Sequence, residues 1–85
     1  MLSNKALVEI SVPAAAKKFD VFIPRSSKMS EVIQLVSSAL SDLSDGNYKA
    51  TEDAILCDAD TGIIFNINME VAELGIKTGS RLMLI

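Results

Sequence analysis

The triplet Asp60-Thr61-Gly62 is the first place in this chain where residue type and spacing could support catalysis. Aspartic proteases use the same triplet, and the retroviral type places one in each subunit of a dimer, where two aspartates share a proton and activate water. Here Ile63 follows the triplet where a small residue is expected, and the run 82–85 lacks the glycine that would shelter the loop. A hairpin turn is the favoured interpretation, because Asp, Thr and Gly are ordinary turn residues. A dimeric aspartic protease using Asp60 stays open as an alternative.

Asp58 and Asp60, with a glycine close by, also suggest a calcium-binding loop. An EF-hand loop requires an oxygen ligand at its fifth position, glycine at its sixth and a bidentate glutamate at its twelfth. Counted from Asp58, those positions hold Gly62, Ile63 and Met69. The pattern fails, so we expect no calcium site.

The rest of the sequence offers little further chemistry. The segment 77–80 (Lys-Thr-Gly-Ser) does not have the several glycines that precede the lysine of a phosphate loop. It also precedes a predicted strand, whereas a phosphate loop leads into a helix. The chain has no histidine and only one cysteine, Cys57, which within one chain removes zinc sites, Cys–His dyads, Ser–His–Asp triads and disulfides. We expect Cys57 to act as a small buried hydrophobic residue. The sequence therefore predicts no enzyme, no catalytic residues, no cofactor and no metal site.

Length and composition point to one globular domain over residues 1–85, since 49% of the residues are hydrophobic. The net charge is −3 and only Lys17-Lys18 are adjacent cations, which argues against nucleic-acid binding. No signal-peptide pattern opens the sequence, and no apolar run approaches the roughly 20 residues that cross a bilayer. Together with the unpaired thiol, this predicts a cytoplasmic protein without direct membrane insertion.

The first half of the sequence changes its hydrophobic period. Every second residue is apolar in 6–12 and in 19–23, which predicts two strands of a β-hairpin joined by about five residues. From Met29 to Leu43 apolar residues then recur every three or four residues, which predicts an amphipathic helix. We expect Ser26 or Ser27 as its N-cap, Gly46 as its C-cap and a loop over 48–53.

The second half predicts shorter elements. Residues 54–57 form a strand candidate, 58–62 a turn and 63–65 the return strand. One helical turn over 71–74 then precedes a final alternating strand over 81–85. The helix and the sheet each carry an apolar face, and laying one across the other buries both. The last strand is expected beside the first and parallel to it. We therefore predict an α+β β-grasp: a mixed sheet of four to five strands with one main helix packed across it.

The closing segment carries a family resemblance. It reads Val71-x-x-Leu74-Gly75-Ile76-x-x-Gly79-Ser80-x-Leu82-x-Leu84. This pattern, with the element order, resembles the ubiquitin-like superfamily and most of all the bacterial YukD/EsaB group of type VII (WXG100) secretion accessory proteins. Ser80 stands where aspartate is commoner in that group.

The resemblance implies a non-enzymatic ubiquitin-like protein-interaction module, an accessory or regulatory component of a bacterial type VII secretion system. Its expected partners are proteins, among them secretion-system components and a second copy of the chain. No Gly-Gly follows Ile85, so a ubiquitin-like modifier or a sulfur carrier is the disfavoured alternative.

The candidate binding surface follows from strand alternation. If Val8, Ile10, Leu82 and Leu84 face the helix, the residues between them face away from it. The outward side chains large and apolar enough to bind a protein are Leu7, Phe22, Met83 and Ile85. We predict that these four form the protein-binding surface, because a group of exposed hydrophobic neighbours is uncommon on a monomer.

Overall fold

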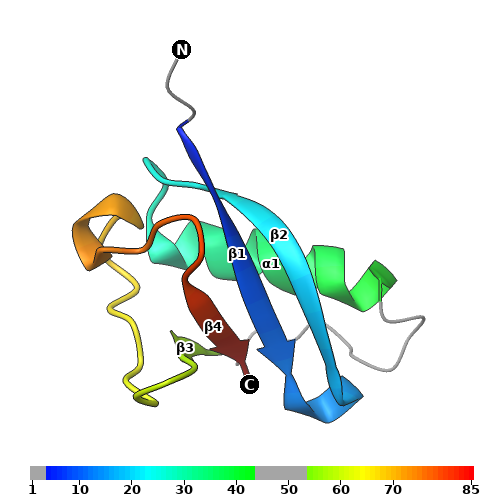
Figure 1. Cartoon of the computed structure of the whole chain (residues 1–85). Helices are drawn as coiled ribbons and strands as arrows, with labels where there is room; N and C mark the ends of the chain where they lie inside the picture. Colours follow the sequence, from blue (N-terminus) through cyan, green and yellow to red (C-terminus); the bar gives the residue numbers. More distant parts are fainter. Residues whose placement is uncertain (1–3, 44–53) are drawn as a thin grey trace.

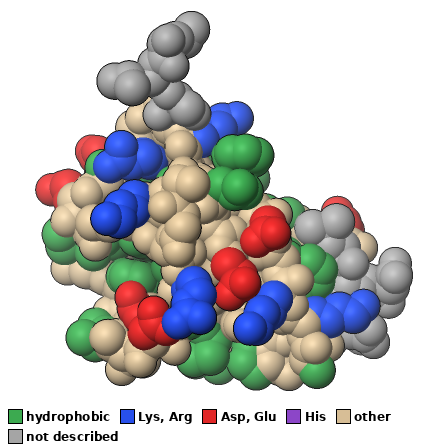
Figure 2. All heavy atoms as spheres, viewed as in Figure 1, with side chains coloured by type: hydrophobic (Ala, Val, Ile, Leu, Met, Phe, Trp, Pro, Cys, Tyr) green, Lys and Arg blue, Asp and Glu red, His purple; other side chains and the backbone are tan. Residues whose placement is uncertain are grey.

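The computed structural model of this chain describes residues 4–43 and 54–85. Within these residues a four-stranded sheet carries one α-helix across one face (Figure 1). The elements in chain order are β1 (Lys5–Val12), the 3₁₀ turn η1 (Pro13–Ala15), β2 (Lys17–Pro24), α1 (Met29–Leu43), β3 (Leu56–Asp58), the 3₁₀ turn η2 (Ala72–Leu74) and β4 (Arg81–Leu84). No helix covers the opposite face of the sheet in the described part of the chain, and we call this the outer face (Figure 1 and Figure 2).

The sheet has the strand order β2-β1-β4-β3. β1 pairs antiparallel with β2 and parallel with β4, while β3 is antiparallel to β4. The last strand therefore lies beside the first and runs in the same direction, as the sequence predicts. The prediction of an α+β β-grasp, with one main helix across a mixed sheet, is confirmed.

Alternation along β1 decides which side chains enter the core. Ala6, Val8, Ile10 and Val12 are buried, and the residues between them are half-buried. Because successive side chains of a strand point to opposite faces, this single strand fixes the inner and the outer face for its neighbours. β2 follows the same rule, with Ile23 buried and its exposed residues alternating with half-buried ones.

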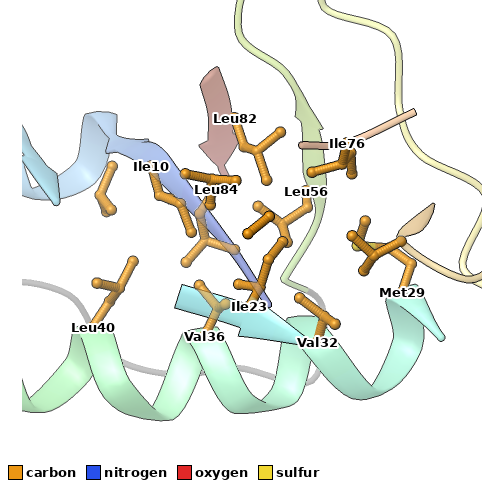
Figure 3. Close-up of a cluster of buried hydrophobic side chains, with 14 residues drawn as sticks. Ile10, Ile23, Met29, Val32, Val36, Leu40, Leu56, Ile76, Leu82 and Leu84 are labelled. Atoms are coloured by element: carbon orange, nitrogen blue, oxygen red, sulfur yellow. The ribbon is translucent and has the colours of Figure 1, made fainter. Parts of the chain in front are cut away.

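The apolar stripe of α1 packs on the inner face of the sheet. Met29, Val32, Val36 and Leu40 are buried on the helix, as its three-and-four spacing predicts. Figure 3 shows these side chains directed at residues from the strands, among them the buried Ile10, Ile23, Leu56, Leu82 and Leu84. Each such side chain contributes about 1.5–3 kcal/mol by leaving water, and the ordering of the chain offsets most of the sum.

The start of α1 differs from its prediction. The expected N-cap at Ser26 or Ser27 is wrong, since the helix begins at Met29. The backbone N–H groups of its first two residues donate to carbonyl oxygens of the loop 66–70, at 2.9 and 3.0 Å. The carboxylate of Glu31 accepts a third bond, 3.2 Å long, from the residue just before the helix. Acceptors from a distant loop have taken the place of a serine hydroxyl, which no local pattern could reveal. The C-cap expected at Gly46 and the loop over 48–53 lie outside the described residues.

The region after β3 also departs from its prediction. The strand candidate over 54–57 is shifted, because β3 spans Leu56–Asp58. The return strand over 63–65 is wrong: this segment makes one isolated bridge, between Cys57 and Ile64. Backbone bonds of 2.9 and 3.2 Å flank that bridge. The chain then leaves the sheet, since its carbonyl groups at 67 and 69 accept the first N–H groups of α1. This segment of the chain can either extend the sheet or supply carbonyl groups to the start of α1, and in the structure it does the second.

Candidate protein-binding surface

The outer face is built from the residues that alternate with the core. In Figure 1 the strands lie in front of α1, so that the view looks onto this face. Strand registers place its side chains in rows that cross the sheet, because directly opposed residues point to the same side. These rows decide which of the sequence-predicted residues are neighbours.

Leu7 and Phe22 occupy one end of the outer face. They are directly opposed partners in the β1–β2 ladder. Leu7 is half-buried, and Phe22 is 62% exposed. A phenylalanine ring exposed beside a leucine offers a contact area that aromatic anchors of protein interfaces commonly use.

Met83 and Ile85 lie toward the other end of the face. Met83 is half-buried and opposes Cys57 on β3, and Ile64 bridges to Cys57 from the far side. Ile85 is 62% exposed and exchanges two backbone hydrogen bonds with Ile55, of 3.0 and 2.8 Å. Residues opposed in this way share a face, so the structure adds two hydrophobic side chains to this end. We call Ile55, Ile64, Met83 and Ile85 the Met83 patch.

A row of charges separates the two hydrophobic ends. Asp20 opposes Glu9 in the antiparallel ladder, and Glu9 opposes Arg81 in the parallel one. The Arg81 guanidinium in turn donates to the carboxylate of Asp60. Figure 2 shows acidic and basic side chains across the middle of this face, with hydrophobic side chains nearer its ends. The structure thus brings Leu7 together with Phe22, and Met83 together with Ile85, but does not join the four into one patch.

Sequence reasoning missed Ile55 and Ile64 as surface residues. They are 39% and 62% exposed, although both stand in apolar runs that predict buried strands. The alternation of 54–57 placed Ile55 and Cys57 on a common face, but nothing in the sequence says that this face is the outer one. The β3–β4 register supplies that information.

A sequence model of protein YukD of the WXG100 protein secretion system (Wss) matches residues 7–84. This chain belongs to the YukD family. A search of curated protein sequences finds no match.

Solved structures share the fold of this YukD-family chain at low sequence identity. The ubiquitin-like domain of the type VII secretion system protein EccD1 of Mycobacterium tuberculosis is 16% identical, with 98% of this chain and 99% of that chain covered and a TM-score of 0.78. The EccD5 ubiquitin-like domain of Mycobacterium xenopi is 22% identical, covers 98% of this chain and 94% of that chain and has a TM-score of 0.69. A structure of the MycP5-free ESX-5 inner membrane complex holds a chain that is 19% identical, with 98% of this chain and 21% of that chain covered and a TM-score of 0.71. At these identities the likeness shows the ubiquitin-like fold.

The Asp58–Gly62 segment of the YukD-family chain is a turn, as predicted. One carboxylate oxygen of Asp58 accepts from the backbone N–H groups of Asp60 and Thr61, at 2.8 and 3.0 Å, and Gly62 has a left-handed φ of 76°. The backbone bond from Thr61, then that from Asp60, lowers the pKa of Asp58. The side chain of Asp60 is 60% exposed and is paired with Arg81, so its environment differs from that of a proton-sharing catalytic pair.

Cys57 is buried beneath the Met83 patch and apart from the main core. Its Sγ–H donates to the Met83 carbonyl oxygen at 3.7 Å. Burial raises the pKa of the Cys57 thiol, and the neighbouring Asp58 carboxylate adds to the shift. The thiol therefore stays protonated and packs as the small hydrophobic residue that the sequence predicts.

Two further observations concern the described residues as a group. Over 4–43 and 54–85, no three His, Cys, Asp or Glu side chains gather closely enough to hold a metal ion. Across the same residues, no helix has both the length and the hydrophobicity needed to traverse a bilayer.

Proposed function

We propose that this YukD-family chain is a non-enzymatic, ubiquitin-like protein-interaction module, with residues 1–85 forming a single domain. In this proposal it is an accessory or regulatory component of a bacterial type VII secretion system and binds protein components of that system. Membership of the YukD family supports the assignment. So does the recurrence of the same fold in ubiquitin-like domains of EccD proteins, although the fold alone does not determine a function.

The observation that carries the proposal is the outer face, which no helix covers within residues 4–43 and 54–85. Helix α1 buries one face of the sheet, while the opposite face presents Leu7 with Phe22 at one end and Met83 with Ile85 at the other. Single exposed apolar residues are normal on any protein. Paired hydrophobic neighbours at both ends of one sheet face are better explained by a partner that covers them.

A binding experiment with a double variant tests this surface. Phe22→Ser combined with Met83→Ser removes one large side chain from each end. Leu35→Ser is the matched control, because Leu35 is 54% exposed on α1, which packs on the other face of the sheet. Isothermal titration against the purified membrane and substrate proteins of the cognate secretion system should show binding by wild type and Leu35→Ser.

The double variant should bind at least about tenfold more weakly, since losing two interface anchors costs about 1 kcal/mol or more each. Circular dichroism and a thermal melt of each variant check that the fold is kept. Undiminished binding by a folded double variant would exclude the outer face as the binding surface. Failure of the wild-type chain to bind any of the secretion proteins would remove the proposed role.

Self-association and location are part of the same proposal. A second copy of the chain is a candidate partner for the exposed hydrophobic pairs, and light scattering across a range of concentrations will show whether the mass doubles. We expect the protein in the cytoplasm, and fractionation of cells that express a tagged copy tests this.

A further inference from the structure

The outer face is hollowed beside the β1–β2 hairpin. The depression has a volume of about 440 Å³ and is lined by Ser11, Pro13, Ala16, Lys17, Lys18 and Met83, among others. Lys18 opposes Ser11 across the β1–β2 ladder, and Ser11 opposes Met83 across the β1–β4 ladder. One row of the sheet thus leads from a lysine, over a serine, to the methionine of the Met83 patch.

The two lysines give this depression a local positive charge. Lys17 and Lys18 are exposed, and neither forms an ion pair within residues 4–43 and 54–85. The chain as a whole carries a net charge of −3, so two adjacent free cations stand out against an acidic background. Unpaired lysines next to a shallow apolar floor favour a ligand that is both anionic and partly hydrophobic.

The backbone at the edge of the depression is strained. Ala16 has φ 53° and ψ 39°, and across the described residues it alone among non-glycine residues has a positive φ. The turn η1 closes onto it through a 3.1 Å bond from the Ala16 N–H to the Pro13 carbonyl oxygen. Glycine would adopt this conformation without strain. Such strain is found preferentially where the backbone shapes a binding site.

We propose that this depression binds an acidic, extended segment of a partner protein, with an apolar side chain against Met83 and a carboxylate directed at Lys18, which shares the outer face with Met83. Lys17, which also lines the depression but opposes the buried Val12, adds positive charge from the edge of the strand. This assignment rests on the proposed function and names the chemistry of the partner. Two charges are too few for a nucleic acid, whose binding needs a larger cationic surface. A peptide carboxylate beside an aliphatic side chain matches both the lysines and the methionine.

Sheet geometry sets the spacing within that segment. Lys18 and Met83 lie on strands two places apart, which corresponds to about 10 Å across the sheet. Side chains on one side of an extended peptide are about 7 Å apart. The carboxylate is therefore expected two residues from the apolar side chain, and the flexible lysine side chain closes the remaining distance.

Selection from a displayed library of random peptides tests the proposal on the whole chain. Wild type should enrich peptides with Asp or Glu two positions from Leu, Ile, Met or Phe. A synthetic peptide of the enriched sequence should shift the backbone amide resonances of Ser11, Lys18 and Met83. Lys17→Glu with Lys18→Glu should bind that peptide about tenfold more weakly, since both attractions become repulsions. The matched control, Lys28→Glu with Lys77→Glu, changes the net charge equally at exposed lysines elsewhere and should bind as wild type does.

Several results would overturn the proposal: no enrichment, enrichment without acidic residues, resonance shifts elsewhere, or equal binding by the Lys17/Lys18 variant. If wild type binds phosphatidylserine vesicles and the Lys17/Lys18 variant does not, the depression binds a lipid surface instead. If wild type forms a dimer and the variant does not, it binds a second copy of the chain. Failure of the proposed function looks different. If the Lys17/Lys18 variant keeps the secretion partner that the Phe22/Met83 variant loses, the function stands and only this assignment fails.

Discussion

Ser37 offers the sharpest test of how this fold is stabilised. It lies on α1, next to the buried Val36, and the residue is only 3% exposed. Its hydroxyl oxygen finds no hydrogen-bond partner among the described residues. An unpaired buried hydroxyl costs about 1–3 kcal/mol of stability, because it has given up water without gaining a protein acceptor. Ser37→Ala removes that hydroxyl and leaves the rest of the side chain in place.

Three terms set the size of the effect. Removing the unpaired group contributes the larger gain, about 1–3 kcal/mol. Alanine adds about 0.5 kcal/mol of helix propensity over serine. The lost oxygen forfeits a few dispersion contacts of about 0.1–0.2 kcal/mol each. The last two terms nearly cancel, so we expect Ser37→Ala to raise the free energy of unfolding by about 1–3 kcal/mol.

Ser38→Ala is the matched control, since Ser38 is the next residue of α1 and is exposed. It should gain the propensity term alone, about 0.5 kcal/mol. Urea unfolding followed by circular dichroism measures both values. Each 1 kcal/mol by which Ser37→Ala exceeds Ser38→Ala should raise the melting temperature by about 4–8 °C further. A Ser37→Ala variant no more stable than Ser38→Ala would refute the reasoning and show that the hydroxyl is satisfied in solution.

Three other substitutions test separate features. Ala16→Gly should raise the free energy of unfolding by up to about 1 kcal/mol, because relief of the left-handed strain exceeds the cost of the added chain entropy. The control Ala14→Gly should lower it by about 0.5–1 kcal/mol. Equal losses for the two variants in urea unfolding would show that the backbone at Ala16 is not strained. Leu84→Ala should cost about 2–5 kcal/mol, because Leu84 is fully buried, and a cost below about 1 kcal/mol would place it outside the core. Folding lowers the pKa of Asp58, so the ionised Asp58 side chain stabilises the folded state. This contribution is fully present above the pKa of the unfolded state and is lost as the pH falls through the lower pKa of the folded state. In Asp58→Asn, the free energy of unfolding should therefore fall less steeply at acidic pH than it does in wild type. If the two proteins lose stability equally as the pH falls, the hydrogen bonds of Asp58 in the turn are not the cause of the loss.

The sequence predicted those parts of the fold that depend on local periodicity. Alternation in 6–12 and spacing in 29–43 matched β1 and α1, because each pattern reports the buried face of its own element. The prediction of Ser26 or Ser27 as the N-cap was wrong because it used only neighbouring residues. The first N–H groups of the helix donate instead to carbonyl groups about forty residues further along the chain. The segment 63–65 failed in the same way, because its strand propensity yields to the demands of the helix start. Contacts between distant segments decide both cases.

The candidate surface shows the same division. Alternation identified Leu7, Phe22, Met83 and Ile85 as outward residues, but their grouping depends on ladder register. The parallel pairing of Glu9 with Arg81 is what puts a charged row between the two hydrophobic pairs. Register is set by the packing of several elements together, so no single segment of the sequence contains it.

That charged row limits how a partner can use the outer face. A partner that covers both hydrophobic ends must also cover Asp20, Glu9 and Arg81, and burying charges is favourable only when each gains a counter-charge or a hydrogen bond. Such a partner must bring a cation for the paired acids Asp20 and Glu9, whereas one that uses only the Met83 end meets Lys17 and Lys18 and needs acids. The two modes therefore demand opposite charges of the partner. Glu9→Gln should weaken a partner that spans the face and leave an acidic partner at the Met83 end unaffected or bound more tightly, so that one titration tells the two modes apart.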